Sequence, residues 1–559
     1  MPKVVNSVRD WQIYLVIIVV GTIIYGKSVT YKFTYADDTQ LVVMNQELLS
    51  DFANIPKLFE TDVFISTTSS QVFYRPLLNI LFMIETHIGK DSPVVYHVTN
   101  ILLHLACSIL VFVVLQQLGS AKPIAGIAAL LFCVHPLNAS AVVWIPGQND
   151  TLLTALLLGS FSFLLRALDT SRVGPLIGHF ILFFLALLTK ESAVVLPILS
   201  VSYVIFFHRS TLHRRVWIIA LFSYFVLIVV WYGLRSLVPQ TFTVHLTSDF
   251  LIARYLSNLP ALLLYFGKVF FPYNLSIFPN LMDNSVWTGL LGVVLFLAVY
   301  LIRRPSSAKG ILWGFGWFLL FLVPPLVSGI IFHEHRAYCA FLGLLFAMAQ
   351  LPLVQSVNLS KNIHVLGFVA VLAVFAVVAM LHSEQFRNRT AYATSAFTSN
   401  PSIDNSYACL AGLFIDEGNY DDAERVIRKG LVRFPNMKTA HRMLGDILAH
   451  RNEFGMAAQE YETFLRLDPL QLYTYIVYGK MCMDAGRIDD APRLWKTSVM
   501  INPNFILGYY YLANFYIHVK NDPDSAMIYA KQIQQRGVTV MPELLRAIQE
   551  NPLYGKRKQ

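Results

Sequence analysis

The chain has 559 residues, of which 55% are hydrophobic, 13% aromatic and only 14% charged. Soluble proteins carry about 25% charged residues, and disordered chains contain few aromatic ones, so both classes are excluded. The formal net charge is +9. Its position along the chain decides whether this excess indicates nucleic-acid binding or the topology of a membrane protein.

The charge divides the chain into two parts. Residues 1–383 contain 22 basic and 15 acidic side chains, whereas the much shorter segment 384–559 contains 21 and 19. The first part is therefore predicted to be a membrane-embedded unit and the second a soluble domain.

Apolar runs near the length of about 20 residues that a bilayer core requires predict eleven transmembrane helices. They lie near residues 10–26, 92–118, 121–135, 148–168, 173–189, 191–208, 214–235, 285–302, 309–330, 335–354 and 361–382. Two further segments, 76–90 and 250–271, are amphipathic or moderately apolar, and we expect them to lie at the outer interface or to dip into it. The predicted fold is all-α.

Lysine and arginine in short loops mark the cytoplasmic side of a membrane. With eleven spans and a cytoplasmic N-terminus, the basic clusters of the short loops all fall on that side: Lys3, Arg9, Arg166, Arg172, Arg209, Arg214, Arg215, Arg303, Arg304, Lys309 and Lys361. The excess charge therefore indicates topology. We expect a multi-pass protein of the plasma (inner) membrane, or of the endoplasmic reticulum in a eukaryote, with its C-terminal domain extracytoplasmic.

Prolines recur every 34 residues in the second part, at Pro401, Pro435, Pro469 and Pro503. This is the period of the tetratricopeptide (TPR) repeat, which consists of two antiparallel helices. We predict a linker at 384–400, about four repeats at 401–550 and a tail at 551–559. One aromatic or histidine position recurs with the repeat and is expected to be a packing position, at Tyr407, His441, Tyr475 and Tyr509.

Polar residues gather in loops that the topology places outside the cytoplasm, where they are candidates for function. The first such loop, 27–91, contains Asp37 and Asp38 and ends near Arg75, and the later loops contain His135, Gln148, Asn149, Asp150, Lys190, Glu191, Glu334, His335, Arg336 and Tyr338. Each has an alternative interpretation: the aspartates can cap a loop helix, and Arg75 and Lys190 can reach lipid headgroups. Their shared side of the membrane favours an active site for an anionic, lipid-anchored substrate.

The order of motifs also resembles a known family. The chain contains YADDTQLV, YRPLLN, YHVTNILLHL, HPLNASAVVWIPGQND, KESAV and HEHRAY, followed by TPR units. This order resembles the TMTC-type (transmembrane and TPR) proteins, which are GT-C membrane glycosyltransferases related to the protein O-mannosyltransferases. The short repeat array favours a bacterial or archaeal homologue.

The resemblance implies transfer of one sugar, with a mannose-like hexose favoured, from a polyprenyl or dolichyl phosphate to a hydroxyl of an exported protein, with inversion. It places Asp37 and Asp38 at the catalytic centre. A hydroxyl nucleophile needs a base, and we predict that Asp37 is this base while Asp38 orients it or keeps it ionised. No metal or cofactor is expected, because the leaving group is a monophosphate.

Cationic groups and hydrogen-bond donors stabilise the phosphate that leaves. The predicted phosphate-binding residues are Arg75, Lys190, Arg336, His135 and His335. The predicted sugar- or acceptor-binding residues are Gln148, Asn149, Asp150, Glu191, Glu334 and Tyr338. The TPR units are expected to present the acceptor in a groove.

Two other functions remain open. One is a ligase or transferase that modifies a lipid-linked glycan or an envelope lipid. The other is a non-enzymatic membrane TPR scaffold.

Overall fold

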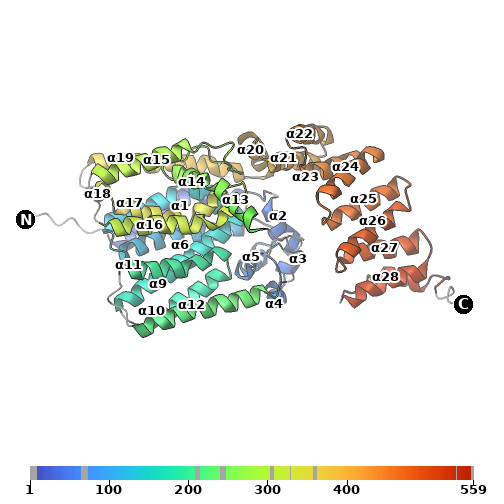
Figure 1. Ribbon diagram of the computed structural model, residues 1–559, viewed down its shortest axis with the longest axis horizontal. Coiled ribbons are helices and arrows are strands. Elements are labelled where there is room, and N and C mark those ends of the chain that lie inside the picture. Colours follow the sequence, from blue (N-terminus) through green and yellow to red (C-terminus); the bar gives the residue numbers. More distant parts are fainter. Residues whose placement is uncertain are drawn as a thin grey trace, which may run out of the picture. The chain divides into compact units, whose positions relative to one another are not determined.

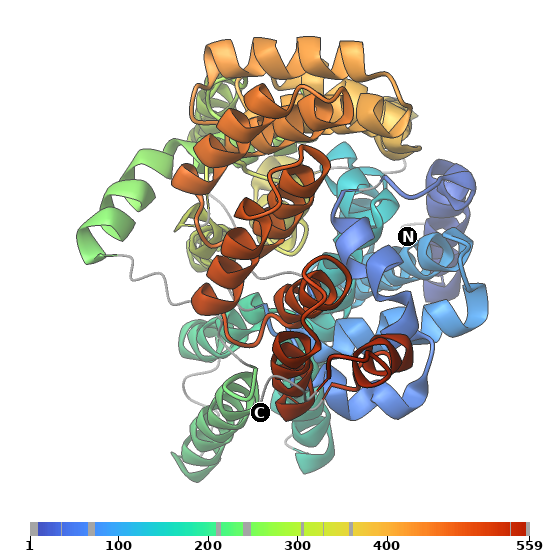
Figure 2. The same cartoon turned by 90° about the vertical axis from the view of Figure 1, so that its right-hand side faces the viewer.

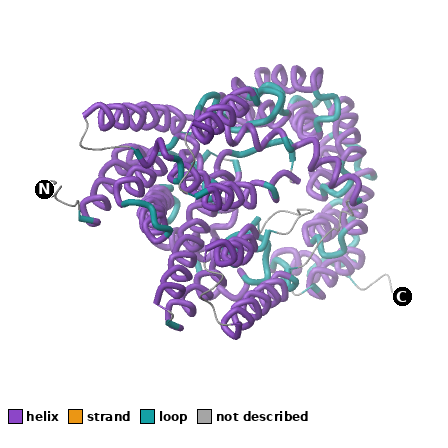
Figure 3. Tube along the Cα trace, turned by 60° about the vertical axis from the view of Figure 1, so that its left-hand side comes forward, coloured by secondary structure: helices purple, strands orange, loops and turns teal. Residues whose placement is uncertain are grey.

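The computed structural model describes residues 9–34, 36–64, 73–170, 172–207, 214–238, 247–302, 307–327, 329–356, 362–536 and 538–554. It divides into two compact units, Met1–Ser406 and Tyr407–Gln559. Within the described ranges the regular structure is entirely helical (Figure 3), which confirms the predicted all-α class.

The first unit is a bundle of long apolar helices (Figure 1). They are α1 (Asp10–Tyr25), α6 (Val94–Gln117), α7 (Lys122–Val134), α9 (Gln148–Thr170), α10 (Val173–Leu187), α11 (Leu196–Phe207), α12 (Arg214–Arg235), α15 (Trp287–Ile302), α16 (Ala308–Leu322) and α19 (Asn362–Ser383). In the described part of the chain, seven helical segments are long and apolar enough to cross a membrane, and eight if α7 and the bent continuation Pro136–Val143 form one span. Three shorter apolar helices accompany them.

Several of these helices expose apolar side chains that would be unfavourable in water. On α19, for example, Ile363 is 70% exposed and Leu381 67%. A contiguous apolar surface of this kind suits contact with lipid. The fold is therefore that of a polytopic membrane protein.

One predicted span differs from the structure. The segment 335–354 is not a continuous helix, because α17 (Phe341–Ala349) has only nine residues and is followed by the separate α18 (Pro352–Gln355). A helix of nine residues is about 14 Å long, too short for a bilayer core of about 30 Å. Every other predicted span contains one of the apolar segments described above.

The segment predicted to lie at the interface, 250–271, forms α13 (Ser248–Asn258) and α14 (Pro260–Phe270). By length and composition Ser248–Phe270 is also a candidate span. However, the Asn258 amide donates to the carbonyls of Leu326 and Gly329, and Lys268 binds Glu334. The last residue of α13 and the last turn of α14 therefore both contact the loop between α16 and α17, while the placement of this segment at the interface stays a prediction.

The segment between α1 and α6 folds into a small layer of helices. These are α2 (Asp37–Leu41), α3 (Gln46–Leu49), α4 (Ile55–Leu58) and α5 (Pro76–Gly89). Leu41, Leu49, Leu58 and Phe82 pack in one buried apolar cluster. Burial of these side chains holds the acidic pair at the start of α2 in a fixed position.

Residues 384–400, predicted to be a linker, are part of the first unit. They include α20 (Arg389–Ser399), in which Tyr392, Ala393 and Ala396 are buried. The Tyr392 ring packs against Trp144. The prediction was wrong because a polar composition does not exclude a short amphipathic helix.

The second unit is a stack of helix pairs, shown from orange to red in Figure 2. The pairs are α21 (Asp404–Asp416) with α22 (Tyr420–Arg433), α23 (Lys438–His450) with α24 (Phe454–Leu467), α25 (Leu472–Asp484) with α26 (Asp490–Ile501), and α27 (Ile506–His518) with α28 (Pro523–Gln535). A last helix, α29 (Pro542–Gln549), buries Leu544 and Ile548 against the fourth pair. The four predicted TPR repeats are present, with α29 as a terminal cap.

The recurring repeat position has a structural role. His441 Nε2 bonds the carbonyl of Pro435, and Tyr475 Oη donates to the carbonyl of Pro469. Tyr407, Tyr475 and Tyr509 are buried. This position therefore ties the first helix of a repeat to the proline that ends the previous one, as expected for packing residues.

Candidate functional site

Asp37 and Asp38 occupy the first turn of α2, but their surroundings differ. Asp38 is 1% exposed and accepts hydrogen bonds from the backbone amides of Thr34, at 2.5 Å, and Ala36, at 2.9 Å, and from Thr34 Oγ1, at 3.0 Å. Asp37 is exposed, and none of the described residues donates a hydrogen bond to its carboxylate. Asp38 is therefore committed to the loop, whereas Asp37 is free to take a proton.

The pKa of Asp37 is raised to about 6. The protein around this carboxylate limits its hydration, the charge of Asp38 raises the pKa further, and the charge of Arg75 lowers it. The expectation that Asp38 keeps Asp37 ionised is therefore wrong in sign. Asp38 makes Asp37 a stronger base instead.

Trp144 connects this acidic pair to the loops across the site. Its indole Nε1 donates to Thr34 Oγ1 at 3.3 Å, and the same hydroxyl donates to Asp38. The indole ring also packs against two histidines. Its centroid lies 5.6 Å from that of the His335 ring and 6.4 Å from that of the His333 ring. Trp144 thus fixes the distance between the acidic loop and the HEHR loop.

Arg75 and Lys190 each contact a carboxylate that has one oxygen without a hydrogen-bond partner among the described residues. Arg75 Nη2 is 3.1 Å from Glu191 Oε2, and Lys190 Nζ is 2.8 Å from Asn149 Oδ1 and 2.6 Å from Asp150 Oδ1. Asp150 Oδ2 and Glu191 Oε1 are buried and have no hydrogen-bond partner among the described residues. Buried acceptors of this kind are costly unless a ligand donates to them.

The three predicted cations form one electrostatic group. Burial lowers the pKa of Lys190, and the charges of Arg75 and Arg336 lower it further against the opposing effect of Asp150. Burial and the charges of Lys190, Arg336 and Arg75 also hold the pKa of His335 well below its ordinary value. His335 is therefore neutral, and with one ring N–H it can still donate a hydrogen bond.

Two residues predicted to bind the substrate, His135 and Gln148, instead make contacts within the protein. His135 is fully buried, with Nε2 bonding the Val269 carbonyl and Nδ1 accepting from the Leu137 amide, so neither ring nitrogen is left for a phosphate. Gln148 is also fully buried and donates to Glu85. Burial raises the pKa of that carboxyl to about 8. Both ring nitrogens of His135 and the side-chain nitrogen of Gln148 are thus used by contacts within the protein.

Glu334 and Tyr338 also point away from this group. Glu334 Oε1 is 2.6 Å from Lys268 Nζ, and its Oε2 is 3.0 Å from His382 Nε2. Tyr338 is fully buried, with its hydroxyl 2.6 Å from His104 Nδ1. Neither side chain is placed to contact a sugar, which corrects the prediction for both.

The sequence did not predict a role for three residues that support the loop of His335 and Arg336. His333 stacks on His335 with ring centroids 5.0 Å apart. Lys268 and His382 hold Glu334 and, through it, the loop that carries His335 and Arg336. The signal for Lys268 was present, since a lysine inside an apolar segment requires a partner.

Comparisons with known proteins find similarity in the first unit of the chain. A family profile described as Dolichyl-phosphate-mannose-protein mannosyltransferase matches residues 75–232. Protein O-mannosyl-transferase TMTC1 of Homo sapiens is 30% identical over 27% of this chain and 17% of its own length. TMTC4 of Mus musculus is 34% identical over 26% of this chain and 22% of its own length. Part of the chain is therefore similar in sequence to the TMTC-type protein O-mannosyl-transferases.

The relationship covers part of each protein. The matches reach about a fifth of the length of these relatives. The profile includes Arg75, Asn149, Asp150, Lys190 and Glu191. Among solved structures, yeast Tom70 resembles the chain with a TM-score of 0.26 and 14% identity, over 78% of this chain and 95% of that one.

Proposed function

We propose that this protein is a GT-C glycosyltransferase that moves one sugar, with mannose favoured, from a polyprenyl or dolichyl phosphate to a hydroxyl of an exported protein. The observation that carries the proposal is an accessible Asp37 whose electrostatic neighbour Arg75 belongs to one cationic group with Lys190 and Arg336. The relationship to the TMTC-type proteins supports the choice of donor and acceptor.

In this mechanism Asp37 is the general base. Its carboxylate takes the proton of the acceptor hydroxyl as the oxygen attacks the anomeric carbon. The bond between that carbon and the phosphate oxygen breaks, and the lipid monophosphate leaves with the bonding electron pair. A single displacement of this kind inverts the anomeric carbon. A pKa near 6 suits a base that works near neutral pH.

The cationic group stabilises the departing phosphate. Arg75 and Arg336 can each grip two phosphate oxygens, while Lys190 supplies a compact charge. The neutral ring of His335 donates a hydrogen bond to the phosphate. The open oxygens of Asp150 and Glu191 accept hydrogen bonds from hydroxyl groups of the sugar, which would satisfy both buried groups.

The choice of donor separates this function from its alternatives. The protein in nanodiscs should transfer sugar from a polyprenyl monophosphate donor and leave a polyprenyl diphosphate oligosaccharide unused. Preference for the diphosphate would indicate the ligase, and transfer from neither would indicate the scaffold. We also propose that no metal takes part, so excess chelator should leave the rate unchanged.

A further inference from the structure

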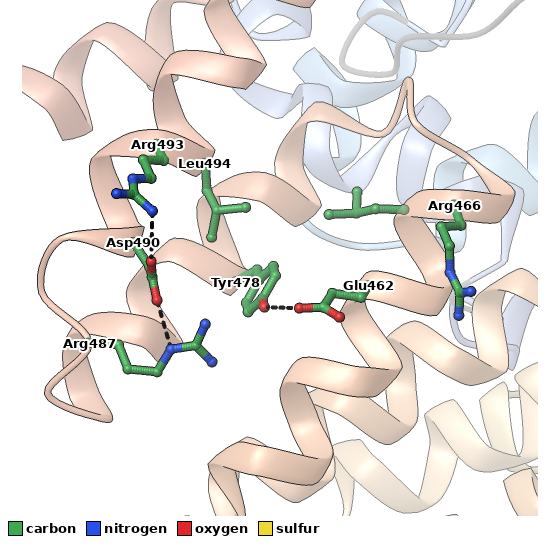
Figure 4. Close-up of a pocket in the computed structure, with 8 residues that line it drawn as sticks. Glu462, Arg466, Tyr478, Arg487, Asp490, Arg493 and Leu494 are labelled. Atoms are coloured by element: carbon green, nitrogen blue, oxygen red, sulfur yellow. Dashed lines mark hydrogen bonds and ion pairs between the residues drawn. The ribbon is translucent and has the colours of Figure 1, made fainter.

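The second unit contains a groove of about 630 Å³ that lies within the repeat stack (Figure 4). It is formed between α24 and α26, the second helices of two adjacent repeats, and Tyr478 of α25 lies between them. Leu465 and Leu494 add apolar surface. Its volume falls within the range of about 300–1,000 Å³ that is usual for ligand pockets.

Arginines outnumber carboxylates in this groove. Three arginines, Arg466, Arg487 and Arg493, face two acidic residues, Glu462 and Asp490. Both carboxylates already have partners, as the dashed lines in Figure 4 show. The Tyr478 hydroxyl donates to Glu462 Oε1 at 2.8 Å, and Arg487 Nε donates to Asp490 Oδ2 at 2.8 Å.

The guanidinium groups keep unused hydrogen-bond donors. Arg493 Nη1 is 3.6 Å from Asp490 and its side chain is 80% exposed. Arg466 donates only to Thr463 Oγ1, at 3.0 Å, among the described residues. A guanidinium has five N–H donors, so both arginines can still bind a carboxylate in a bidentate manner.

We propose that this groove binds an extended polypeptide segment of a partner protein that carries acidic and apolar side chains. The carboxylates would bind Arg466 and Arg493, and the apolar side chains would contact Leu465, Leu494 and the tyrosine ring. Single exposed ion pairs contribute little, so the binding depends on several contacts at once. The inference concerns the repeat unit alone and does not require the sugar transfer to occur.

The test is fluorescence anisotropy with the full chain in nanodiscs of zwitterionic lipid. The probe is a labelled peptide built from Glu, Leu and Ser, compared with a peptide in which every Glu is Gln. We expect the Glu peptide to bind at least about tenfold more tightly at low salt, because hydrogen bonds to charged groups are the stronger ones. The difference should shrink as salt is added. Equal binding of the two peptides would overturn the proposal.

Charge-reversal variants test whether the peptide binds at Arg466 and Arg493. Arg466→Glu with Arg493→Glu should abolish the preference for the Glu peptide and create one for a Lys counterpart. The matched control is Lys480→Glu, an exposed residue two positions after Tyr478 on α25 and therefore about 200° around that helix. An equal loss in the control, or no change in the reversed groove, would contradict the proposal. If the double variant does not fold, the milder Arg466→Gln must still weaken Glu-peptide binding.

Discussion

At the scale of single residues, adjacent positions in the sequence have opposite roles in the site. Asp37 and Asp38 are neighbours, yet Asp38 is bound by Thr34 and Ala36 while Asp37 is open. In the 3₁₀ turn Glu334–Ala337, consecutive side chains diverge by about 120°, so Glu334 meets Lys268 while His335 meets Trp144. Sequence motifs singled out both groups, but the contacts that hold Asp38 and Glu334 depend on residues distant in the fold or on loop geometry, which the motifs do not encode.

The pH dependence of transfer should report the ionisation of Asp37. The surrounding protein limits the hydration of Asp37 and the charge of Asp38 acts with it to raise its pKa, so the protonated, inactive form accumulates below about pH 6 and kcat/KM should fall about tenfold per unit there. The charge of Arg75 lowers this pKa. Arg75→Gln should therefore move the acidic limb to higher pH. The limb should stay in place in the control Lys57→Gln, an exposed lysine in the same loop. A limb unmoved by Arg75→Gln would argue against Asp37 as the titrating base.

Lys190 should affect the donor and not the acceptor. Lys190→Ala removes a charge-assisted contact worth about 1.5–3 kcal/mol, so the KM for the lipid donor should rise about tenfold to a hundredfold. The KM for the acceptor should change little. Steady-state kinetics with each substrate varied in turn provide the measurement, and Lys27→Ala, an exposed lysine paired with Glu384, is the control. Equal effects on the two KM values would count against phosphate binding by Lys190.

At the scale of helices, the apolar runs and the proline period predicted most elements. The predictions for two segments, 335–354 and 384–400, failed for different physical reasons. The run at 335–354 is apolar because α17 is buried inside the protein, where its residues are almost all inaccessible, and a buried helix cannot be told from a span by hydropathy. The segment 384–400 has mixed composition but gains its helix from packing of Tyr392 against Trp144.

The buried group of Lys268, Glu334 and His382, in which Lys268 and Glu334 form an ion pair, joins α14, the turn Glu334–Ala337 and α19. Lys268→Met or Glu334→Gln alone leaves a buried charge without its partner and should cost about 3–5 kcal/mol. The double variant Lys268→Met with Glu334→Gln should recover most of this loss. Thermal unfolding in nanodiscs measures the effect. Single variants as stable as the unchanged protein would show that the group does not fasten these elements.

At the scale of the whole molecule, two units of different physical character share one chain. The first exposes apolar surface suited to lipid, and the second is a capped helical repeat with charged surfaces. Their boundary lies close to the predicted start of the repeats, because the change in charge density follows the change from lipid to water. The eleven-span topology and the orientation stay predictions. Lys3, Arg209, Arg303, Arg304 and Lys361, on which they partly rest, lie outside the described residues.

The central claim is that Asp37 activates a hydroxyl of an exported protein for attack on a lipid-linked sugar. The most direct measurement is mass spectrometry of exported proteins from cells that lack this gene and are complemented with either the unchanged protein or Asp37→Asn at equal expression. The unchanged protein should restore a hexose-sized modification on Ser or Thr, and Asp37→Asn should leave those sites unmodified. Full modification in cells that carry Asp37→Asn would contradict the account.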